Sequence, residues 1–524
     1  LRPLRDAEQA LSAGRGSRLA QVLSQSDGIE EGRDKCNHNE PLVQQPLSVL
    51  GIGDLINTLL DEQQGVKSAH TRIDNLLTEL SLKRETVTST ISVSGAKFPN
   101  KILIRQLLEK LDLRLDGPGK LGLGSNNLLF TACELLLFAQ EEVGNNLLLI
   151  EEPEAHLHAQ RQLRVMKFLQ EQAGKREERI QVIVTTHSPN LASAIELDNI
   201  VMIHGRRAFS MARGKTILEE SDYSFLQRFL DVTKANLFFA RGVMIVEGDA
   251  ENILLPTLAN LIGRDFTEHG VSIVNVGGVG LHRYARIFQR ADGEKLDIPV
   301  ACVTDMDVMP DCAPEIIGKV KNGNDWPDEN KRRWRSKSDF EGQTELDNCR
   351  KEKVDKASGQ SVKTFVSDEW TLEYDLALGP KDEKGCFSEG LAEDVFVAAS
   401  LADEDDAINA QKKRHDDVEN AACKEFAELK NKAEDKDGCE AQEVLASQIY
   451  AKFAKDGVSK AIAAQYLAER LRAKFQNGEL SAEDLRKRLP NYLKNAIDYV
   501  TGGGNATESA ECEKATAHEQ SPSV

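Results

Sequence analysis

The chain alternates short apolar runs with longer stretches in which apolar residues recur at helical spacing, mainly between residues 119 and 304. The short runs have the length of buried strands, whereas the stretches between them have the length of helices. Strands that alternate with helices predict parallel sheets, so the expected fold class is α/β. The expected strands are 147–150, 180–185, 243–246, 271–276 and 299–304, and the expected helices are 159–172, 249–262 and 281–291.

The segments on either side of this alternation are predicted to be helical. Leucines recur near helical spacing between residues 47 and 112, which predicts a helical hairpin used for packing or dimerisation. The apolar run 128–138 follows Ser125, which predicts a helix with this serine near its N-cap. Residues 400–475 read as charged helices, and residues 501–524, rich in Gly, Ser and Glu, are expected to be disordered.

The composition excludes several classes of protein. The chain has 524 residues, of which 40% are hydrophobic, enough for two or three domains. Its net charge of −19 argues against a protein that coats nucleic acid by bulk charge, although a local basic patch stays compatible with binding. Nine scattered cysteines without a Cys-x-x-Cys pair indicate reduced thiols and a cytoplasmic location. No apolar run approaches the about 20 residues of a membrane span.

A basic patch does occur at residues 331–337, with the sequence Lys-Arg-Arg-Trp-Arg-Ser-Lys. These charges would hold a DNA backbone while Trp334 stacks on a base. A solvated insertion explains the same pattern equally well, and both interpretations stay open.

The first candidate site lies where the strand 147–150 ends in Glu151 and Glu152. Such a strand delivers one acid to Mg²⁺, and the next acid orients the attacking water. The following strand ends near His187, and the upstream stretch Leu-Gly-Leu-Gly-Ser-Asn-Asn at 121–127 opens a helix whose free N–H groups would attract a phosphate. Each feature alone has a structural explanation, but the three in this order favour an ATPase.

The second candidate site lies where two later strands end in acids. Glu247 follows one strand and Glu251 stands four residues on, in the first turn of a helix, so both can face one pocket. Asp305 and Asp307 share a face if the extended geometry of their strand persists. Ligands collect at the carboxyl ends of parallel strands, and carboxylates there suit Mg²⁺ or Mn²⁺. The pattern predicts a metal site for phosphodiester chemistry.

Three further features extend this second site. The stretch Val-Asn-Val-Gly-Gly-Val-Gly at 274–280 lacks the spacing of a dinucleotide fingerprint, and its glycines would let backbone approach a phosphate. Glu373 adds an acid, and Lys460 stands at a predicted helix start, although Lys412 or Lys413 compete for the same role.

The two sites in this order resemble the OLD (overcoming lysogenization defect) family of ATP-dependent nucleases, in which an ABC-type ATPase precedes a Toprim domain. The resemblance spans about residues 119–470. It implies that Glu151 is the Walker B acid, Glu152 the catalytic glutamate and His187 the switch histidine. The residues that match the ATP-binding signature loop are Gly122, Gly124, Ser125 and Asn126, although the usual serine is missing at position 122.

One departure concerns the phosphate cradle of the ATPase. The sequence contains no Gly-x-x-x-x-Gly-Lys-Ser/Thr motif, so this segment is expected upstream of Leu1. ATP would be bound and hydrolysed only with that segment present.

For the Toprim domain, the resemblance implies two Mg²⁺ or Mn²⁺ ions and catalysis by Glu247 together with Lys460, which would stabilise the transition state. It also implies a DNA substrate and a homodimer without membrane attachment. A helicase partner, and a role in phage defence or in repair, are left open. The implied metal ligands are Glu247, Glu251, Asp305, Asp307 and Glu373.

The expected architecture is an ABC ATPase lobe with a helical insert, then a parallel-sheet Toprim domain and a helical C-terminal region. Two rival functions remain: a non-cleaving DNA-clamp ATPase similar to SMC proteins, and a Toprim topoisomerase or primase. The expected segments are 1–115, the helical part of the ATPase; 116–238, the ATPase lobe; 239–400, the Toprim domain with a polar insert at 311–362; 401–500, its helical extension; and 501–524, the tail.

Overall fold

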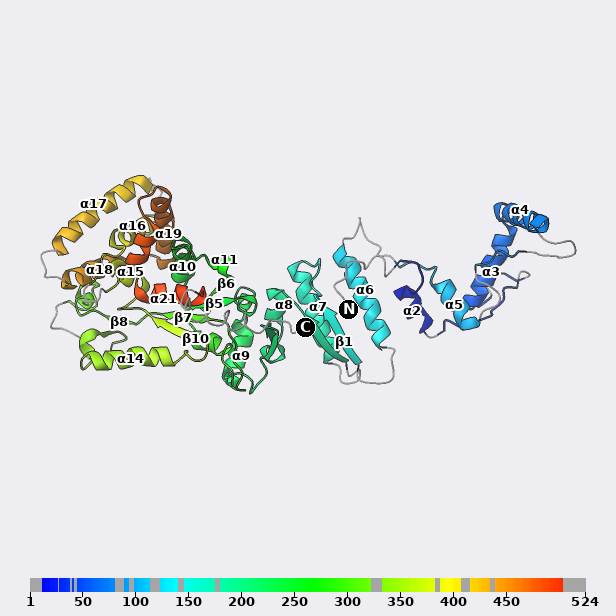
Figure 1. Ribbon diagram of the computed structural model, residues 1–524, viewed down its shortest axis with the longest axis horizontal. Helices are drawn as coiled ribbons and strands as arrows, with labels where there is room; N and C mark the ends of the chain where they lie inside the picture. Colours follow the sequence, from blue (N-terminus) through cyan, green and yellow to red (C-terminus); the bar gives the residue numbers. More distant parts are fainter. Residues whose placement is uncertain are drawn as a thin grey trace, which may run out of the picture. The chain divides into compact units, whose positions relative to one another are not determined.

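A computed structural model of the chain describes its two compact units, Leu1–Ala194 and Ile195–Val524. Figure 1 shows the first unit in blue to cyan and the second in green to red. The described residues are 12–26, 28–37, 40–41, 45–80, 89–93, 99–113, 123–139, 146–174, 180–321, 332–381, 387–406, 415–433 and 439–502.

The first unit begins with helices and ends with a two-stranded parallel sheet. The helical character predicted for 47–112 is confirmed by three helices, whereas its role in dimerisation stays a prediction. The elements are α2 (Arg18–Ser24), α3 (Val49–Glu62), α4 (Gln64–Leu80), α5 (Asn100–Leu108), α6 (Leu123–Ala139), β1 (Asn146–Glu151), α7 (Ala159–Ala173), β2 (Ile180–Thr185) and α8 (Pro189–Ala194).

The sheet of the first unit is apolar on both faces. Leu148 and Ile150 of β1 pack on Leu169 of α7. The alternate residues point the other way, and Leu149 and Ile183 are about half exposed at 52% and 55%. Parallel strands are usually covered on both faces, so α7 supplies only one of the two layers that such a sheet normally has.

The second unit is built on a four-stranded, fully parallel sheet in the order β10-β7-β5-β6. Its elements up to the last strand are η2 (Leu197–Asn199), β3 (Val201–His204), β4 (Arg207–Ser210), α9 (Glu220–Phe229), η3 (Lys234–Phe239), β5 (Gly242–Val246), α10 (Asp249–Leu261), α11 (Phe266–His269), β6 (Val271–Asn275), α12 (Leu281–Arg286), β7 (Val300–Thr304), β8 (Val308–Met309), α13 (Ala313–Ile316), β9 (Arg335–Ser336), η5 (Lys337–Asp339), α14 (Gln343–Asp355) and β10 (Val362–Val366).

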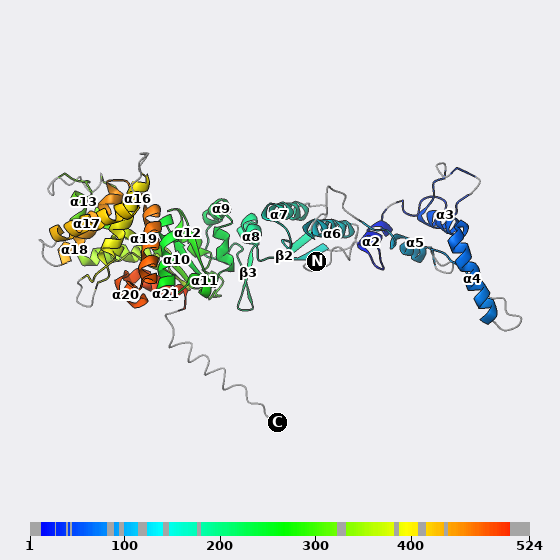
Figure 2. The ribbon, with the colours of Figure 1, turned by 90° about the horizontal axis from the view of Figure 1, so that it is seen from above.

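The C-terminal region of the second unit is helical, as the sequence predicts. Helix α19 packs along both α10 and α16, and Figures 1 and 2 show these three helices side by side. The helices are α15 (Leu372–Leu378), α16 (Ala392–Asp406), α17 (His415–Ala433), α18 (Cys439–Ala454), α19 (Lys460–Gln476), α20 (Ala482–Arg488) and α21 (Asn491–Val500). Among the described residues, no helix has both the length and the apolar content needed to cross a membrane.

Two hydrophobic cores hold the sheet of the second unit between helices. Met244 and Val246 of β5 belong to the core formed with α10 and the C-terminal helices. Val243 and Ile245 belong to the core formed with α12, α9 and the hairpin β3–β4. Every side chain of β5 is therefore buried, which explains why the strand reads as a continuous apolar run.

Several elements differ from the sequence-based expectations. The helix predicted at 281–291 ends at Arg286, because the next residues turn so that the Gln289 side chain donates to two carbonyl groups ahead of β10. The stretch 311–362, predicted as a polar insert, contains α14 and runs to the start of β10. Ser125 lies inside the first turn of α6 rather than before it.

Candidate active site

The site is built first from the end of β5 and the start of α10. Glu247 follows β5, and its Oε1 accepts a 2.6 Å hydrogen bond from the Thr304 hydroxyl at the end of β7. Gly248 is the N-cap of α10 and has an extended backbone. A Cβ at Gly248 would lie 3.0 Å from Oε2 of Glu251, which places Glu251 directly beside this cap.

Asp305 and Asp307 do not share a face, because β7 ends at Thr304 and the backbone turns. Asp307 has a left-handed φ of 59°, and its side chain is 68% exposed. Asp305 is partly buried, and one of its carboxylate oxygens accepts a hydrogen bond of 3.1 Å from the backbone N–H of Leu372. The strand geometry does not continue through Asp307, so the prediction that Asp305 and Asp307 share a face is wrong. Only Asp305 points to the start of α15.

Helices α15 and α19 contribute an acid and a base that contact each other. Glu373, in the first turn of α15, is buried with 8% of its side chain exposed. Lys460 is the first residue of α19, as predicted, after the N-cap Ser459. The Nζ atom of Lys460 lies 2.8 Å from Oε2 of Glu373. The structure thus joins two residues that are far apart in the sequence.

The pKa values show that these carboxyl groups share one electrostatic environment. Burial, followed by the charge of Glu373, raises the pKa of Asp305 well above its usual range. Burial likewise raises the pKa of Glu251, with Glu373 and Glu247 adding to the effect. Burial lowers the pKa of Lys460, but Glu373, Tyr450 and Asp305 together outweigh it and raise this pKa above its usual value. The carboxylates are close enough to repel one another, and Lys460 relieves the repulsion only in part.

A second lysine, Lys353 on α14, also contacts the site. Its Nζ atom lies 2.6 Å from Oδ2 of Asp307 and donates a 2.9 Å hydrogen bond to the backbone carbonyl of Asp305. Helix α14 packs on β10, and Arg350 anchors it by donating to the carbonyl groups of Ser367 and Asp368. Sequence reasoning missed Lys353, because α14 lies in a polar stretch without hydrophobic periodicity.

The glycine-rich loop after β6 lies beside Glu247. The backbone N–H of Gly278 donates to the carbonyl of Glu247, and that of Gly277 donates to the Asn275 side chain. Gly280 has φ 75°, and a Cβ there would lie 2.9 Å from the Phe225 ring, so this position requires glycine. The loop borders the site, while its expected contact with a phosphate stays a prediction.

In the first unit, the predicted ATPase residues gather at the ends of β1 and β2. Oε1 of Glu152 lies 3.7 Å from Nε2 of His187, and Glu152 has a left-handed φ of 45°. Glu154 accepts hydrogen bonds from the Thr186 hydroxyl and from the backbone of His187. Glu151 ends β1 with an exposed side chain.

The predicted signature helix also reaches this cluster. A Cβ on Gly124 would lie 2.4 Å from the carbonyl of His156, and Arg161 donates a 3.0 Å hydrogen bond to the Ser125 hydroxyl. Asn126 lies in the first turns of α6. Gly122, Lys412 and Lys413 lie outside the described residues.

Comparison with protein families finds a match for two segments of the chain. A family described as "Overcoming lysogenization defect protein-like, TOPRIM domain" matches residues 238–307. The chain carries an OLD-like Toprim domain. A family described as "AAA ATPase domain" matches residues 31–192. The prediction of an ATPase domain followed by a Toprim domain is confirmed.

Two curated relatives match part of the chain. Endonuclease GajA of Bacillus cereus (strain HuB5-5) is 24% identical over 295 residues, 48% of this chain and 42% of that protein. OLD nuclease of Thermus scotoductus (strain ATCC 700910 / SA-01) is 27% identical over 216 residues, 40% of this chain and 39% of that protein. The chain thus spans about two fifths of the length of these relatives.

Solved structures of OLD C-terminal regions also match. The region from Xanthomonas campestris pv. campestris is 21% identical and covers 54% of this chain and 100% of that chain, with a TM-score of 0.28. The region from Burkholderia pseudomallei is 18% identical and covers 51% of this chain and 98% of that chain, with a TM-score of 0.26.

The donor set of the Toprim site fits a divalent metal in its chemistry. Its candidate ligands are all carboxylates, which suit Mg²⁺ and Mn²⁺, and burial together with the charge of neighbouring carboxylates raises the pKa values of Asp305 and Glu251. Within the described part of the chain, no three His, Cys, Asp or Glu side chains stand in an arrangement that could hold a metal ion. Lys460 and Lys353 instead pair with Glu373 and Asp307.

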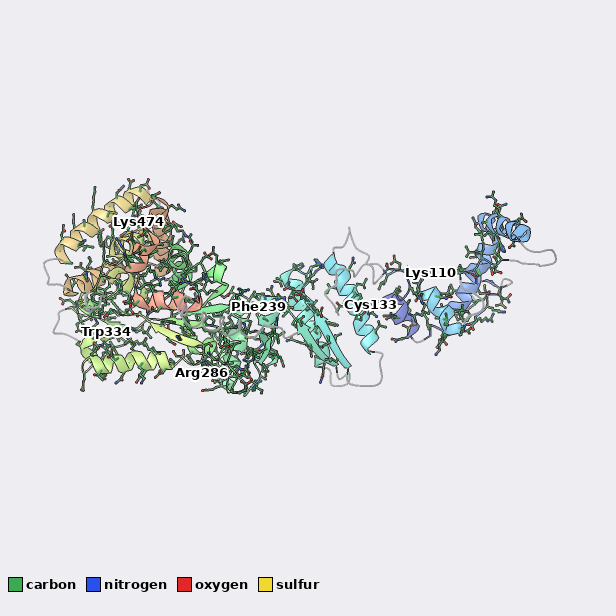
Figure 3. All side chains as sticks on the ribbon, in the orientation of Figure 1. Lys110, Cys133, Phe239, Arg286, Trp334 and Lys474 are labelled. Atoms are coloured by element: carbon green, nitrogen blue, oxygen red, sulfur yellow. The ribbon has the colours of Figure 1, made fainter. Side chains whose placement is uncertain are left out.

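The basic patch near Trp334 of the Toprim unit is tied to acidic partners. Lys337 pairs with Glu369 at 2.7 Å and with Glu443 at 2.8 Å. Trp334, labelled in Figure 3, packs against the larger core and lies under the guanidinium of Arg332. Lys337 and Trp334 are thus tied into the fold, whereas Arg333 and Arg335 are exposed, so DNA binding by the patch stays a prediction. Lys331 lies outside the described residues.

Proposed function

We propose that the Toprim domain is a metal-dependent DNA endonuclease that uses two Mg²⁺ or Mn²⁺ ions and is coupled to the ATPase domain. The observation that carries this proposal is the cluster of Glu251, Asp305 and Glu373 around Lys460, with Glu247 near Glu251. A merely structural carboxylate cluster would destabilise the fold, because like charges at short range repel. The names of the curated relatives support hydrolysis of nucleic acid as the reaction class.

In this mechanism Glu247, Glu251, Asp305, Asp307 and Glu373 would hold the metal ions. Divalent ions bound there supply Lewis acidity toward the phosphate and activation of a water molecule. The Thr304 hydroxyl orients Glu247 for this role, because it donates a hydrogen bond to one of the two carboxylate oxygens. Lys460 already carries its charge, because Glu373 keeps its ammonium protonated, and it would neutralise the charge that grows on the phosphoryl oxygens.

In the ATPase domain we propose that Glu151 holds Mg²⁺, Glu152 orients water and His187 responds to the γ-phosphate of ATP. Gly122, Gly124, Ser125 and Asn126 would contact ATP held by a second copy of the protein. The support is the cluster at the ends of β1 and β2, in which Glu152 and His187 are neighbours. The homodimer in this proposal is tested by the mass of the protein in solution, and a monomer at all concentrations would contradict it.

A plasmid assay tests the nuclease proposal. The purified chain is incubated without ATP with supercoiled DNA in Mg²⁺, Mn²⁺ or EDTA. We expect metal-dependent nicked or linear product from the wild type and none from Glu247→Gln, which keeps an oxygen for Thr304 but loses the charge. Glu268→Gln is the matched control, because Glu268 is an exposed acid on α11 away from the site. Full cleavage by Glu247→Gln would refute the assignment.

A non-cleaving DNA clamp is the second candidate function. It is favoured by one observation: lysines already pair with Glu373 and Asp307, so these two carboxylates do not need a metal for neutralisation. For this candidate we expect the wild type to retain DNA without product at any metal concentration. The same plasmid assay therefore separates the two functions.

A further inference from the structure

A cavity of about 390 Å³ opens beside the strand-end acids of the Toprim domain. Glu247 and Asp307 line it from the ends of β5 and β7. His282 of α12, Lys353 of α14 and Lys356 at the C-cap of α14 also line it. One small space therefore combines the candidate metal ligands with a cationic wall, although the chain as a whole carries a net charge of −19.

His282 lies near the cationic side chains of this wall. Burial, followed by the charges of Lys356 and Arg286, lowers the pKa of His282. Arg286 is held in place by a 2.9 Å hydrogen bond to Asp222, whose side chain is 2% exposed, and Figure 3 labels Arg286 in this region. Arg286 is therefore fixed by the fold and its charge is offset by Asp222, so the cationic residues that line the cavity are Lys353 and Lys356.

One of the residues that line the cavity has a buried hydroxyl group. Thr364 of β10 lines the cavity and is 9% exposed, and its buried hydroxyl oxygen has no hydrogen-bond partner among the described residues. A buried hydroxyl without a partner is unfavourable, so native structures seldom keep one.

Lys353 and Lys356 are three residues apart on α14 and so lie on the same side of the helix. Lys353 is engaged with Asp307, whereas Lys356 is exposed. Lys351, two residues before Lys353, is equally exposed but does not line the cavity. The end of α14 therefore presents one exposed lysine to the cavity and another away from it.

We propose that this cavity is a subsite for one nucleotide of a DNA strand, next to the phosphate that is cleaved, and that Lys356 is a positioning residue that binds the backbone phosphate of this nucleotide. This proposal rests on the proposed nuclease function and specifies where the DNA strand would bind. The cavity volume falls in the range of about 300–1,000 Å³ that small-molecule sites have, which is room for a nucleotide. The anionic DNA strand and the lysines that line the cavity have complementary charge.

DNA binding without cleavage tests the subsite. The whole chain is titrated against a fluorescent single-stranded oligonucleotide in EDTA, at several salt concentrations, and anisotropy gives Kd. Loss of one phosphate contact should weaken binding about five- to tenfold at about 0.1 M salt and reduce the salt slope by about one. We expect this for Lys356→Gln, near wild-type binding for Lys351→Gln, and recovery in Lys356→Arg. Lys356 is exposed, so its substitution should leave the fold intact, which circular dichroism checks.

Competition identifies the ligand. An unlabelled oligonucleotide should displace the probe, whereas inorganic phosphate at the same phosphate concentration should not. Equal weakening by Lys356→Gln and Lys351→Gln, an unchanged salt slope in Lys356→Gln, or equal competition by free phosphate would each overturn the subsite. Binding is measured without metal, so an absence of cleavage would refute the nuclease while a selective effect of Lys356→Gln would still support the subsite.

Discussion

Lys460 is held in the site by the packing of α19 on α16. A buried ion pair between these two helices contributes to this packing, and its effect on the free energy of unfolding can be measured. Asp394 of α16 is 5% exposed and accepts a 2.6 Å hydrogen bond from Nε of Arg470 on α19, which is 12% exposed. Lys474 pairs with the same carboxylate. Asp394→Ala removes the carboxylate and leaves Arg470 with fewer acceptors in a largely buried place.

The expected cost follows from this burial. Removing one partner of a buried pair costs about 3–5 kcal/mol, because the remaining charge loses its compensation. Arg470 keeps contacts to Glu419 and Glu393, so we expect the lower end, about 3 kcal/mol. The doubly apolar variant Asp394→Leu with Arg470→Met should recover part of the loss, because the two most buried charges are gone while Lys474, Glu393 and Glu419 each lose a partner.

Urea unfolding followed by tryptophan fluorescence measures the free energy of unfolding of the compact unit that contains Asp394 and Arg470. All three tryptophans, Trp326, Trp334 and Trp370, lie in the unit Ile195–Val524, so the signal reports that unit alone. Glu483→Ala is the control, because this residue is 79% exposed and pairs with Lys487 on the surface, where a pair contributes at most about 1 kcal/mol. If Asp394→Ala lost no more stability than the control, the argument from burial would be wrong.

Three further predictions use the same fluorescence assay. Gly280→Ala should lose about 1–3 kcal/mol, because alanine disfavours the φ of 75° and its Cβ would press on Phe225; an unchanged midpoint would contradict this. Mn²⁺ at 100 times its Kd should stabilise the wild type by about 2.7 kcal/mol, and Asp305→Asn should lose most of this gain; equal gains would remove Asp305 from the metal site. Burial raises the pKa of Glu369, but Lys337 and Lys381 outweigh it and hold this pKa below its usual 4.5. A lowered carboxyl pKa stabilises the fold above the usual value and loses this effect as the pH falls through the folded value, so the wild type should lose more stability than Glu369→Gln between about pH 6 and about pH 3. Parallel pH curves would refute the role of Glu369.

Local signals located the parts of the site that depend on short stretches of sequence. The strand before Glu247 is buried on both sides and therefore reads as an apolar run. Ser459 before Lys460 is an N-cap whose side chain accepts the N–H of Ile462, a bond within one turn. Patterns of this kind predict where an acid or a lysine stands along a strand or helix, because the interactions that form the element are local.

Interactions between distant residues decided the rest. The turn at Asp307 is held by the carbonyl of Trp370, which accepts the backbone N–H of Met306 at 3.0 Å and that of Asp307 at 3.3 Å. Strand β10 is only five residues long and pairs with β7, from which α14 separates it. Lys353 reaches the site only because this pairing places α14 there.

The sequence by itself determined that the chain carries acids at the ends of buried parallel strands, in the order of an ATPase followed by a Toprim domain. Only the tertiary structure decided which of these acids point inward, which lysines oppose them and that a cavity lies beside them. The physical reason is that strand and helix formation depend on neighbours along the chain, whereas the direction and charge of a side chain in a site depend on packing between elements dozens to hundreds of residues apart.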